Sequence, residues 1–510
     1  MTHSTLIIML CALVSKILSF GGQLLITYFY GASPETDAYY VATTIPVFAI
    51  DWVSTMGPTI LIPVFTATMV RHGEQEAWKI ASTVIIMLTV PLILFMGFSM
   101  YLSESLLRFT APGLSVYQLS LAVELFILSG PVVILLTMSK ILMGLHNVFE
   151  RFARPAASVI FDPLGIVIGA LFLSSFFGIH ALVIGQSFGA FVQIIILVVG
   201  LVGAHKLRWS LDLNHPELKS VYKMLAPLLL GSMLYLLLPT IERYFASGLP
   251  VGRITHLSLA YRVGSFIATL LISGLATIVF ARLSNQTAAK DLKTAYATLS
   301  LSLRLFLVVG IPIVILSPHY AKSLVSLFFE RGEFSGTDTL AVAQIVPLYM
   351  LAMTAAACGT LIGRGFHSIL QDTLTLAIIS AVFLLIYLGC CYTLVPVWGY
   401  IGLALASSIF WTCSTATAAF LLRHRLGVGG GRGILRVLTH ASASAVITYA
   451  AVSAVSPWLS SPWSYIMTTA CGFLLYGLIG QFIFKVPEIS FIITRCMQAS
   501  AAFTRKSKLA

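Results

Sequence analysis

The sequence predicts an all-α polytopic membrane protein. Hydrophobic residues make up 58% of the 510 residues, whereas charged residues make up only 9%, against about 25% in an ordinary soluble domain. The apolar residues form continuous runs of about 20 residues, the length that a helix needs to cross a bilayer. They lack the period-two alternation of an outer-membrane barrel. A soluble enzyme with one buried core is excluded, because too little polar surface exists to cover this apolar mass.

About fourteen apolar runs are long enough to span a bilayer. Each should be a helix, because backbone that faces lipid must satisfy its own hydrogen bonds. The second run carries Pro46, Pro58 and Pro63 and should be bent or broken. Two segments, 102–114 and 323–334, should each form an interfacial helix followed by a turn. The predicted spans are 5–30, 37–69, 80–102, 118–145, 153–175, 179–202, 223–245, 256–281, 295–317, 340–362, 373–395, 399–422, 437–456 and 463–484.

The two interfacial segments belong to an internal repeat with an offset of about 220 residues. Phe109 and Ser115 align with Phe329 and Ser335, and the spans that follow align as well. The first twelve spans therefore form two six-helix lobes of the same orientation, an arrangement typical of transporters with a substrate cavity between the halves. The predicted domains are the N-terminal lobe with an inner linker (1–222), the C-terminal lobe (223–436), and two extra helices with a basic tail (437–510).

The positive charge of the chain follows its predicted topology. Lys and Arg number 30 against 18 Asp and Glu, which gives a net charge of +12. The basic residues gather in every second connection, whereas alternate connections such as 31–36 and 395–399 contain almost none. This positive-inside pattern places both termini in the cytoplasm. It also explains the basic excess without a nucleic-acid partner, and we expect none.

The sequence contains no recognisable catalytic or cofactor motif. The seven cysteines lie in or beside apolar runs without the spacing of a metal site, so they should be packing residues. No Walker A motif or hydrolase signature occurs. We therefore expect no cofactor, no metal and no enzymatic activity.

Polar side chains inside the predicted spans form the candidate substrate-binding site, because such residues are costly in a bilayer and usually line a cavity. Lys16 and Arg262 come from equivalent regions of the two lobes, and such cations bind phosphate or diphosphate. The alternative for Lys16 is an ion pair with Asp37 or Asp51. Asp37 begins a span directly after a turn and would also suit a helix cap. Asp51 is either a proton or cation site or a partner of Lys16, and Gln23 completes the set.

Other charges in the spans have simpler explanations. Glu124, Lys140, Glu242 and Arg243 are expected near span ends, where long side chains can reach the interface. Asp162 lies within the fifth span, directly before a proline.

Several segments resemble the N-terminal signature of the MviN/MurJ lipid II flippases, within the multidrug/oligosaccharidyl-lipid/polysaccharide exporter superfamily. The resemblance spans most of the chain. The matching segments are Ser15–Phe20, Tyr30–Ala32, Thr36–Ala42, Ile45–Pro46, Ile62–Phe65, Ala111–Gly113, Arg151–Phe152, Pro155–Ala156, Ala260–Arg262, Glu330–Phe334, Asp338–Thr339 and Gln371–Thr373.

This resemblance implies a flippase of the bacterial cytoplasmic membrane. It would move an undecaprenyl-diphosphate-linked sugar from the inner to the outer leaflet by alternating access. The family implies a cationic cavity for the diphosphate and sugar, and a groove along the last two helices for the lipid tail. Lys16 and Arg262 stand at usual arginines of the first and eighth spans, and Asp37 matches the family aspartate.

The chain departs from the family pattern in ways that leave three functions open. Gly22–Gln23 replaces a common Arg-Asp pair, and Thr44, Ile50 and Asp51 stand where basic residues are usual, so the cavity should be less positive. The first choice is a flippase for a polyprenyl-diphosphate-linked saccharide, lipid II. The alternatives are a flippase for another lipid-linked oligosaccharide of exopolysaccharide or capsule, and a cation-coupled multidrug antiporter. Expected partners are the lipid-linked saccharide, membrane lipids and, for coupled transport, a cation or proton.

Overall fold

The computed structural model describes residues 2–149, 151–201, 211–212, 218, 237–288, 292–370, 372, 374–426, 431–459 and 461–490. Every regular element in these ranges is a helix, and no strand occurs in them. This confirms the predicted all-α fold. The described residues contain 11 helices that are long and apolar enough to cross a membrane, and these match eleven of the predicted spans. Of the other three predicted spans, 37–69 is formed by α2 (Pro34–Ala42) and α3 (Thr44–His72), and 256–281 lies within α13 (Arg253–Ala288). Residues 223–236 of the span 223–245 lie outside the described residues.

The helices divide between two compact units. Unit 1 comprises Met1–Thr255 and Arg331–Ser335, and unit 2 comprises His256–Glu330 and Gly336–Ala510. Unit 2 therefore contains the predicted C-terminal lobe only from His256 onward, without Arg331–Ser335, together with the last two spans. The predicted boundary between residues 222 and 223 lies outside the described residues, as does most of the connection 203–222.

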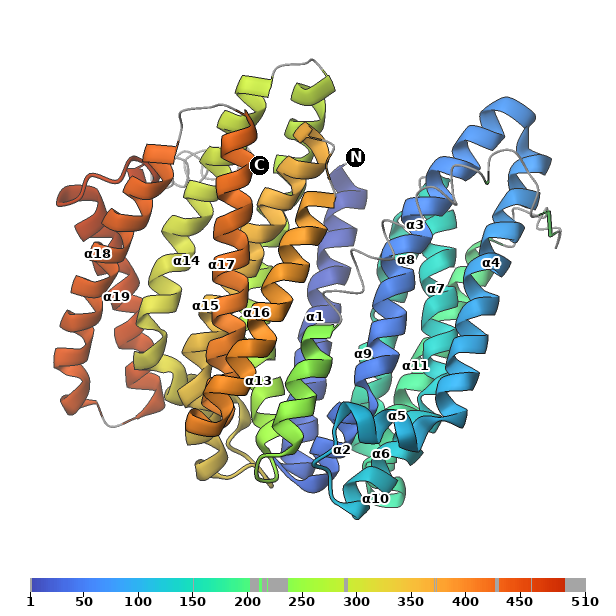
Figure 1. The fold of residues 1–510 in the computed structure, drawn as a ribbon, viewed down its shortest axis with the longest axis horizontal. Coiled ribbons are helices and arrows are strands. Elements are labelled where there is room, and N and C mark those ends of the chain that lie inside the picture. Colours follow the sequence, from blue (N-terminus) through green and yellow to red (C-terminus); the bar gives the residue numbers. More distant parts are fainter. Residues whose placement is uncertain are drawn as a thin grey trace, which may run out of the picture. The chain divides into compact units, whose positions relative to one another are not determined.

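In unit 1, the long helices run side by side (Figure 1). A sharp change of direction at Thr43 separates α2 from α3, and Pro46 lies in the first turn of α3, where a proline costs no helical hydrogen bond. The second predicted span is therefore broken, as expected. The elements are α1 (Thr2–Tyr30), α2 (Pro34–Ala42), α3 (Thr44–His72), α4 (Glu74–Tyr101), α5 (Ser103–Thr110), α6 (Val116–Leu128), α7 (Gly130–Val148), α8 (Ala153–Ser158), α9 (Phe161–Ile168), η1 (Gly169–Leu173), α10 (Ser174–Phe177) and α11 (His180–Leu201).

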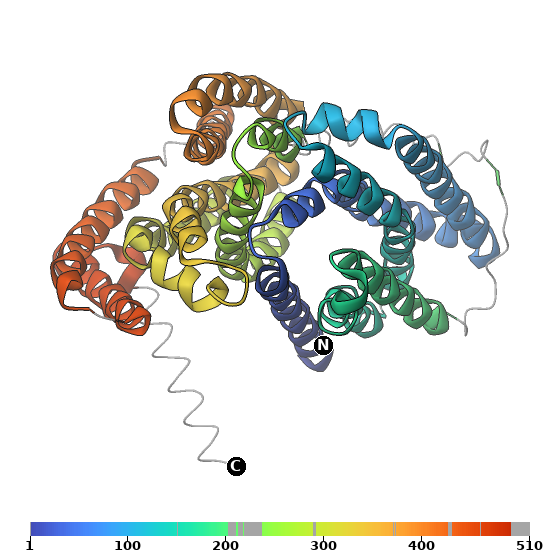
Figure 2. The same ribbon diagram turned by 90° about the horizontal axis from the view of Figure 1, so that it is seen from below.

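In unit 2, α18 and α19 pack on α14, and Figure 2 shows this grouping end-on. α14 continues without interruption to Phe329, so the prediction of a separate interfacial helix at 323–334 is wrong. The corresponding prediction at 102–114 is confirmed by α5. The elements are α13 (Arg253–Ala288), which begins in unit 1, α14 (Leu292–Phe329), α15 (Gly336–Gly365), η2 (Phe366–Leu370), α16 (Leu374–Trp398), α17 (Tyr400–Leu426), α18 (Gly431–Val455), η3 (Ser456–Trp458) and α19 (Pro462–Phe482).

Corresponding landmarks recur at the repeat offset of about 220 residues. Ser115 caps α6, and its counterpart Ser335 directly precedes α15. Gly178, with a φ of 54°, ends α10, and Gly399, with a φ of 55°, follows α16. Both glycines turn the chain in the left-handed region that side chains rarely adopt. The two halves therefore share local turn chemistry as well as an apolar pattern.

Four glycines bring the backbones of α9 and α11 into direct contact. Gly165 and η1 residue Gly169 face Gly185 and Gly189. A Cβ atom on Gly165 would lie 2.2 Å from the carbonyl oxygen of Gly185, and one on Gly185 would lie 2.3 Å from that of Gly165. Small residues four apart on both helices are a common means of packing membrane helices, because they permit close van der Waals contact. This pairing fixes α9 against α11.

Replacing Gly185 by Ala should therefore destabilise unit 1. The new methyl group can be accommodated only if α9 and α11 separate, and overpacking of this kind costs about 1–3 kcal/mol. We expect a lower melting temperature of the detergent-solubilised protein by fluorescence-detected size exclusion. Gly97→Ala is the matched control, since a Cβ there meets nothing within 4 Å. Equal melting temperatures for the two variants would contradict the packing argument.

Candidate functional site

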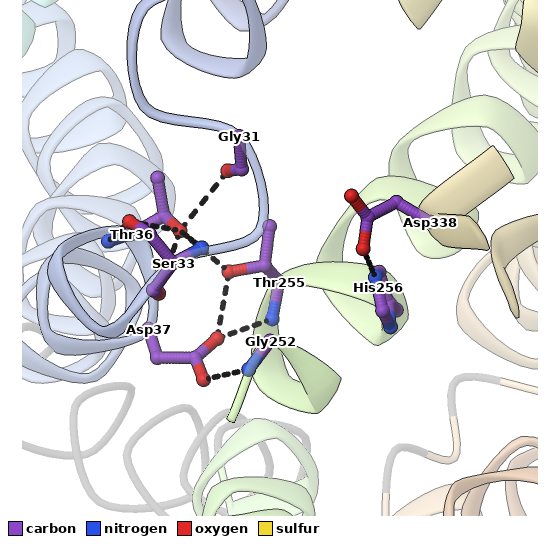
Figure 3. Close-up of polar contacts among 8 residues, drawn as sticks. All are labelled: Gly31, Ser33, Thr36, Asp37, Gly252, Thr255, His256 and Asp338. Atoms are coloured by element: carbon purple, nitrogen blue, oxygen red, sulfur yellow. Dashed lines mark hydrogen bonds and ion pairs between the residues drawn. The ribbon is translucent and has the colours of Figure 1, made fainter. Parts of the chain in front are cut away.

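The carboxylate of Asp37 caps the first turn of α13. Asp37 is 2% exposed, and its Oδ2 accepts a hydrogen bond from the backbone N–H of Gly252 at 2.6 Å. Its Oδ1 accepts from the backbone N–H and the hydroxyl of Thr255, at 2.8 and 2.7 Å (Figure 3). The first N–H groups of a helix have no partner within it, and a negative charge there is also favoured by the helix dipole. Asp37 thus ties α2 to the start of the helix that carries Arg262.

The cap of α2 itself is a different residue. Ser33 accepts a hydrogen bond from the Thr36 N–H, and the Thr36 side chain accepts one from the Ser33 N–H, which completes a capping box. The prediction that Asp37 could cap the span that it begins is therefore wrong.

A turn from late in the chain completes this part of unit 1. The N–H of Glu333 donates to the carbonyl oxygen of Tyr28 at 3.0 Å. Gly332 and Gly31 have φ values of 61° and 58°. A Cβ on Gly332 would lie 2.2 Å from the Tyr28 oxygen, and one on Gly31 would lie 2.4 Å from the Glu333 oxygen. The glycines of two family motifs are thus explained by one backbone-to-backbone contact.

The two predicted site residues on α1 differ in their surroundings. Gln23 is 5% exposed, and its Oε1 accepts a hydrogen bond from the Tyr40 hydroxyl at 2.8 Å. Lys16 is exposed and forms no hydrogen bond or ion pair with any described residue. Within the described part of the chain, the alternative pairing of Lys16 with Asp37 or Asp51 is therefore not formed.

A group of polar side chains lies between the helices of unit 1. The ammonium of Lys140 on α7 attracts the carboxylates of both Asp51 on α3 and Asp162 on α9. Asp162 Oδ1 also accepts a hydrogen bond from Gln186 Nε2 on α11 at 3.0 Å. Asp51 therefore has Lys140 as a cationic neighbour. Lys140 is half-buried and Asp51 exposed, and the position of Lys140 near a span end stays a prediction.

In unit 2, Arg262 lies partly buried on α13 where that helix packs closely against α15. The rings of Tyr261 and Tyr349 meet edge to face with centroids 6.1 Å apart. Nearer the start of α13, His256 Nε2 lies 2.9 Å from Asp338 Oδ1 (Figure 3). These contacts fix the rotation of α13 against α15 and so the face on which Arg262 lies.

The family motif around residue 372 is an ionised helix cap. The Asp372 carboxylate accepts hydrogen bonds from the hydroxyl of Thr375 at 2.6 Å and from its N–H at 3.0 Å, and it pairs with Arg425. The Thr375 hydrogen bonds, followed by Arg425, lower the pKa of Asp372 to about 2. Asp372 therefore stays charged at physiological pH and links the start of α16 to the end of α17.

An apolar groove of about 530 Å³ lies between α14 and α19. The hydroxyl of Tyr476 donates to the carbonyl oxygen of Val308 at 2.8 Å, so it is satisfied inside the protein. The family resemblance implied a lipid groove along the last two helices, whereas this groove lies between α14 and α19. Its residues are ordinary apolar ones, so the sequence alone did not mark it. The groove is lined by Val308, Val309, Pro312, Phe473, Leu474, Tyr476, Gly477, Leu478, Gln481 and Ile489.

Comparison with known proteins identifies the family. A family model described as lipid II flippase MurJ matches residues 4–476. The chain belongs to the MurJ lipid II flippase family. This confirms the resemblance seen in the sequence motifs.

Related MurJ proteins are identical to this chain at a minority of aligned positions, but the alignments cover most of each chain. A probable lipid II flippase MurJ of Buchnera aphidicola subsp. Acyrthosiphon pisum is 25% identical over 374 residues, covering 70% of this chain and 71% of the relative. The lipid II flippase MurJ of Burkholderia cenocepacia is 23% identical over 430 residues, covering 82% of each chain.

Solved structures show the same fold. A MurJ lipid II flippase in an inward closed conformation has a TM-score of 0.79 at 20% identity, and the alignment covers 94% of this chain and 98% of that one. An inward-facing multidrug resistance transporter of the MATE family has a TM-score of 0.68 at 14% identity, covering 81% and 94%. The MurJ fold therefore extends over nearly the whole chain.

Replacing Asp37 by Ala should destabilise the protein by about 1–3 kcal/mol, because buried N–H donors at the start of α13 lose their acceptor. Thr255→Ala should cost less, since the backbone N–H groups keep the carboxylate. The double variant should cost less than the sum of the two, as expected for residues in contact. Thermal unfolding in detergent measures all three. Glu35→Ala, which removes a surface hydrogen bond to Tyr117, is the control, and strict additivity would argue against the cap.

Proposed function

We propose that the chain is a flippase that moves lipid II, a polyprenyl-diphosphate-linked saccharide, from the inner to the outer leaflet by alternating access. The observation that carries this proposal is the match to the MurJ family over residues 4–476. The two relatives described above are named as a probable lipid II flippase and a lipid II flippase. Costly polar side chains within the apolar helices add support, because such residues usually mark a transport path.

The chain is a multi-pass protein of the bacterial inner membrane. We propose that both termini lie in the cytoplasm, because the connections rich in Lys and Arg alternate with connections that have almost none. In this orientation α1, α14 and α18 begin at the cytoplasmic side, or close to it.

Lys16 and Arg262 are proposed to bind the diphosphate during transport. The Lys16 ammonium has no partner among the described residues, so its donors are available to a substrate. Arg262 can offer a phosphate two parallel hydrogen bonds. Asp37 acts indirectly in this proposal, by holding the first turn of the helix that carries Arg262. The hydrogen bond from the Tyr40 hydroxyl to Gln23 fixes the position of α1 against α2.

The charge group of Asp51, Lys140 and Asp162 is the proposed site of any coupling cation or proton. It holds two carboxylates and one ammonium, so an added cation or proton would neutralise it. Membrane potential is a second source of work, since it contributes about 2.3 kcal/mol per charge per 100 mV and favours outward movement of an anionic diphosphate. Neither source requires a nucleotide site.

The groove between α14 and α19 is proposed to hold part of the polyprenyl tail. Its walls are almost wholly apolar, and one of them is α19, which lies outside the repeat. Burial of apolar surface contributes about 25 cal/mol per Å², so a long isoprenoid chain would gain substantially from it.

Loss of Lys16 or Arg262 should slow transport of lipid II by about tenfold or more, because each removes a charge-assisted hydrogen bond worth about 1.5–3 kcal/mol. The measurement is translocation of labelled lipid II in liposomes that contain Lys16→Ala, Arg262→Ala or both. Lys16→Arg should retain activity. Arg108→Ala, which removes a cation from an exposed pair with Glu104, is the control. Unchanged transport in the double variant would remove both residues from the proposed site.

Filling the groove should impair transport of long-chain substrates more than that of short-chain ones. Gly477 lines the groove, and a Cβ there meets nothing within 4 Å, so Gly477→Leu should fold while occupying groove volume. Gly389→Leu on α16 is the matched control, since that glycine is equally open and does not line the groove. Transport of lipid II analogues with long and short isoprenoid chains separates the two variants. Equal behaviour would contradict a role for the groove.

A further inference from the structure

Three basic residues lie close in the chain to residues that line the groove in unit 2 or pack beside it. Arg304 lies one helical turn before the groove residue Val308 on α14. Arg436 lies beside Val437 on α18, and Lys485 lies beside Val486 after α19; both valines belong to the apolar cluster that contains Val308. We call Arg304, Arg436 and Lys485 the basic mouth of the groove.

The packing of the chain end brings the three segments that carry these cations together. His440, one turn after Arg436, lies 3.2 Å from the carbonyl oxygen of Phe484 through its Nδ1. The segment after α19 thus rests on α18. Ile489 at its end lines the groove and joins the same cluster as Val308 and Val437. The mouth is therefore built by three elements of one packed region.

Arg304 is held in place but keeps unused donors. Its Nη1 donates to Glu488 Oε1 at 2.6 Å, and its Nε lies 3.4 Å from the carbonyl oxygen of Ser300. The Glu488 side chain is 3% exposed, whereas that of Arg304 is 27% exposed. Nη2 has no partner among the described residues. Two N–H groups of an oriented, partly exposed guanidinium are therefore available at the end of an apolar groove.

Lys485 occupies a position that normally favours glycine. Its φ of 49° makes it the single non-glycine residue with a positive φ in the described ranges. The N–H of Val486 donates to the Gly480 oxygen at 2.9 Å, and that of Phe484 to the Ile479 oxygen at 3.2 Å, so the chain folds back on the end of α19. A lysine here strains the backbone without improving the helix end, and such strain often marks a functional position. Lys485 and Arg436 are exposed and have no partner among the described residues.

We propose that the basic mouth binds the diphosphate of the polyprenyl lipid while its chain enters the groove, as a docking site used before the headgroup reaches Lys16 and Arg262. This inference rests on the proposed function. Three cations and one buried carboxylate at the end of an apolar groove match a lipid that joins an anionic head to an apolar chain. The forked donors of arginine suit phosphate oxygens in particular. A zwitterionic or neutral lipid would not use the excess charge.

The test measures equilibrium binding of labelled geranylgeranyl diphosphate to the full chain in phosphatidylcholine nanodiscs. The starting protein carries Lys16→Ala and Arg262→Ala, so that the mouth is examined without the proposed transport site. Adding Arg436→Gln and Lys485→Gly should weaken binding about tenfold, since a basic residue near an anionic lipid contributes about a few-fold each. Affinity for geranylgeraniol, which lacks the diphosphate, should not change. Arg108→Gln is the matched loss of an exposed cation elsewhere.

Three results would overturn the proposal. The first is loss of all binding in the Lys16→Ala, Arg262→Ala protein, and the second is equal binding with and without the mouth substitutions. The third is displacement of the probe by an equal concentration of phosphatidylglycerol, which would mean that the mouth holds bulk anionic lipid. Misfolding is excluded independently, because Lys485→Gly relieves the positive φ and should keep or raise the melting temperature. Binding at the mouth in a wild-type protein that fails to translocate lipid II would contradict the proposed function alone.

Discussion

The capping of α13 by Asp37 is the interaction on which the arrangement of polar groups in unit 1 depends. In an apolar surrounding, backbone N–H groups at a helix start cannot turn to water, so they need an acceptor from the protein. Asp37 provides both carboxylate oxygens to Gly252 and Thr255. The same constraint explains why Ser33 caps α2 and why Glu333 and Tyr28 join their backbones. At each chain reversal in this region, the backbone groups that lack a helical partner form hydrogen bonds with nearby residues.

The remaining charged groups are of two kinds: some have an opposite charge nearby, and others have none among the described residues. The carboxylates of Asp51 and Asp162 have Lys140 as a cationic neighbour, so their charges are partly balanced within the protein. Lys16, Arg436 and Lys485 have no such balance among the described residues. Balanced groups suit a site that responds to a small ion, whereas unbalanced cations suit an anionic ligand. The proposed coupling and substrate sites follow this distinction.

The fold could be predicted because its cause is local: an apolar run of sufficient length must be a helix in a bilayer. The partner of Asp37 could not be predicted, since a carboxylate near a turn can cap its own helix or a distant one. The groove was invisible in the sequence, since Val308 and Leu474 resemble any other packing residue until α14 and α19 are seen together.

The contact between Gly332 and Tyr28 has a consequence for biogenesis. Residues 331–335 belong to unit 1, although the chain between Thr255 and Arg331 builds α13 and α14 of unit 2. The ribosome must therefore synthesise those two helices before the turn that completes the first unit exists. Until then, the N-terminal helices lie in the membrane without the N–H of Glu333 that later donates to the backbone oxygen of Tyr28. Assembly of this protein is thus interleaved, and its first half cannot reach its final form as an independent early product of translation.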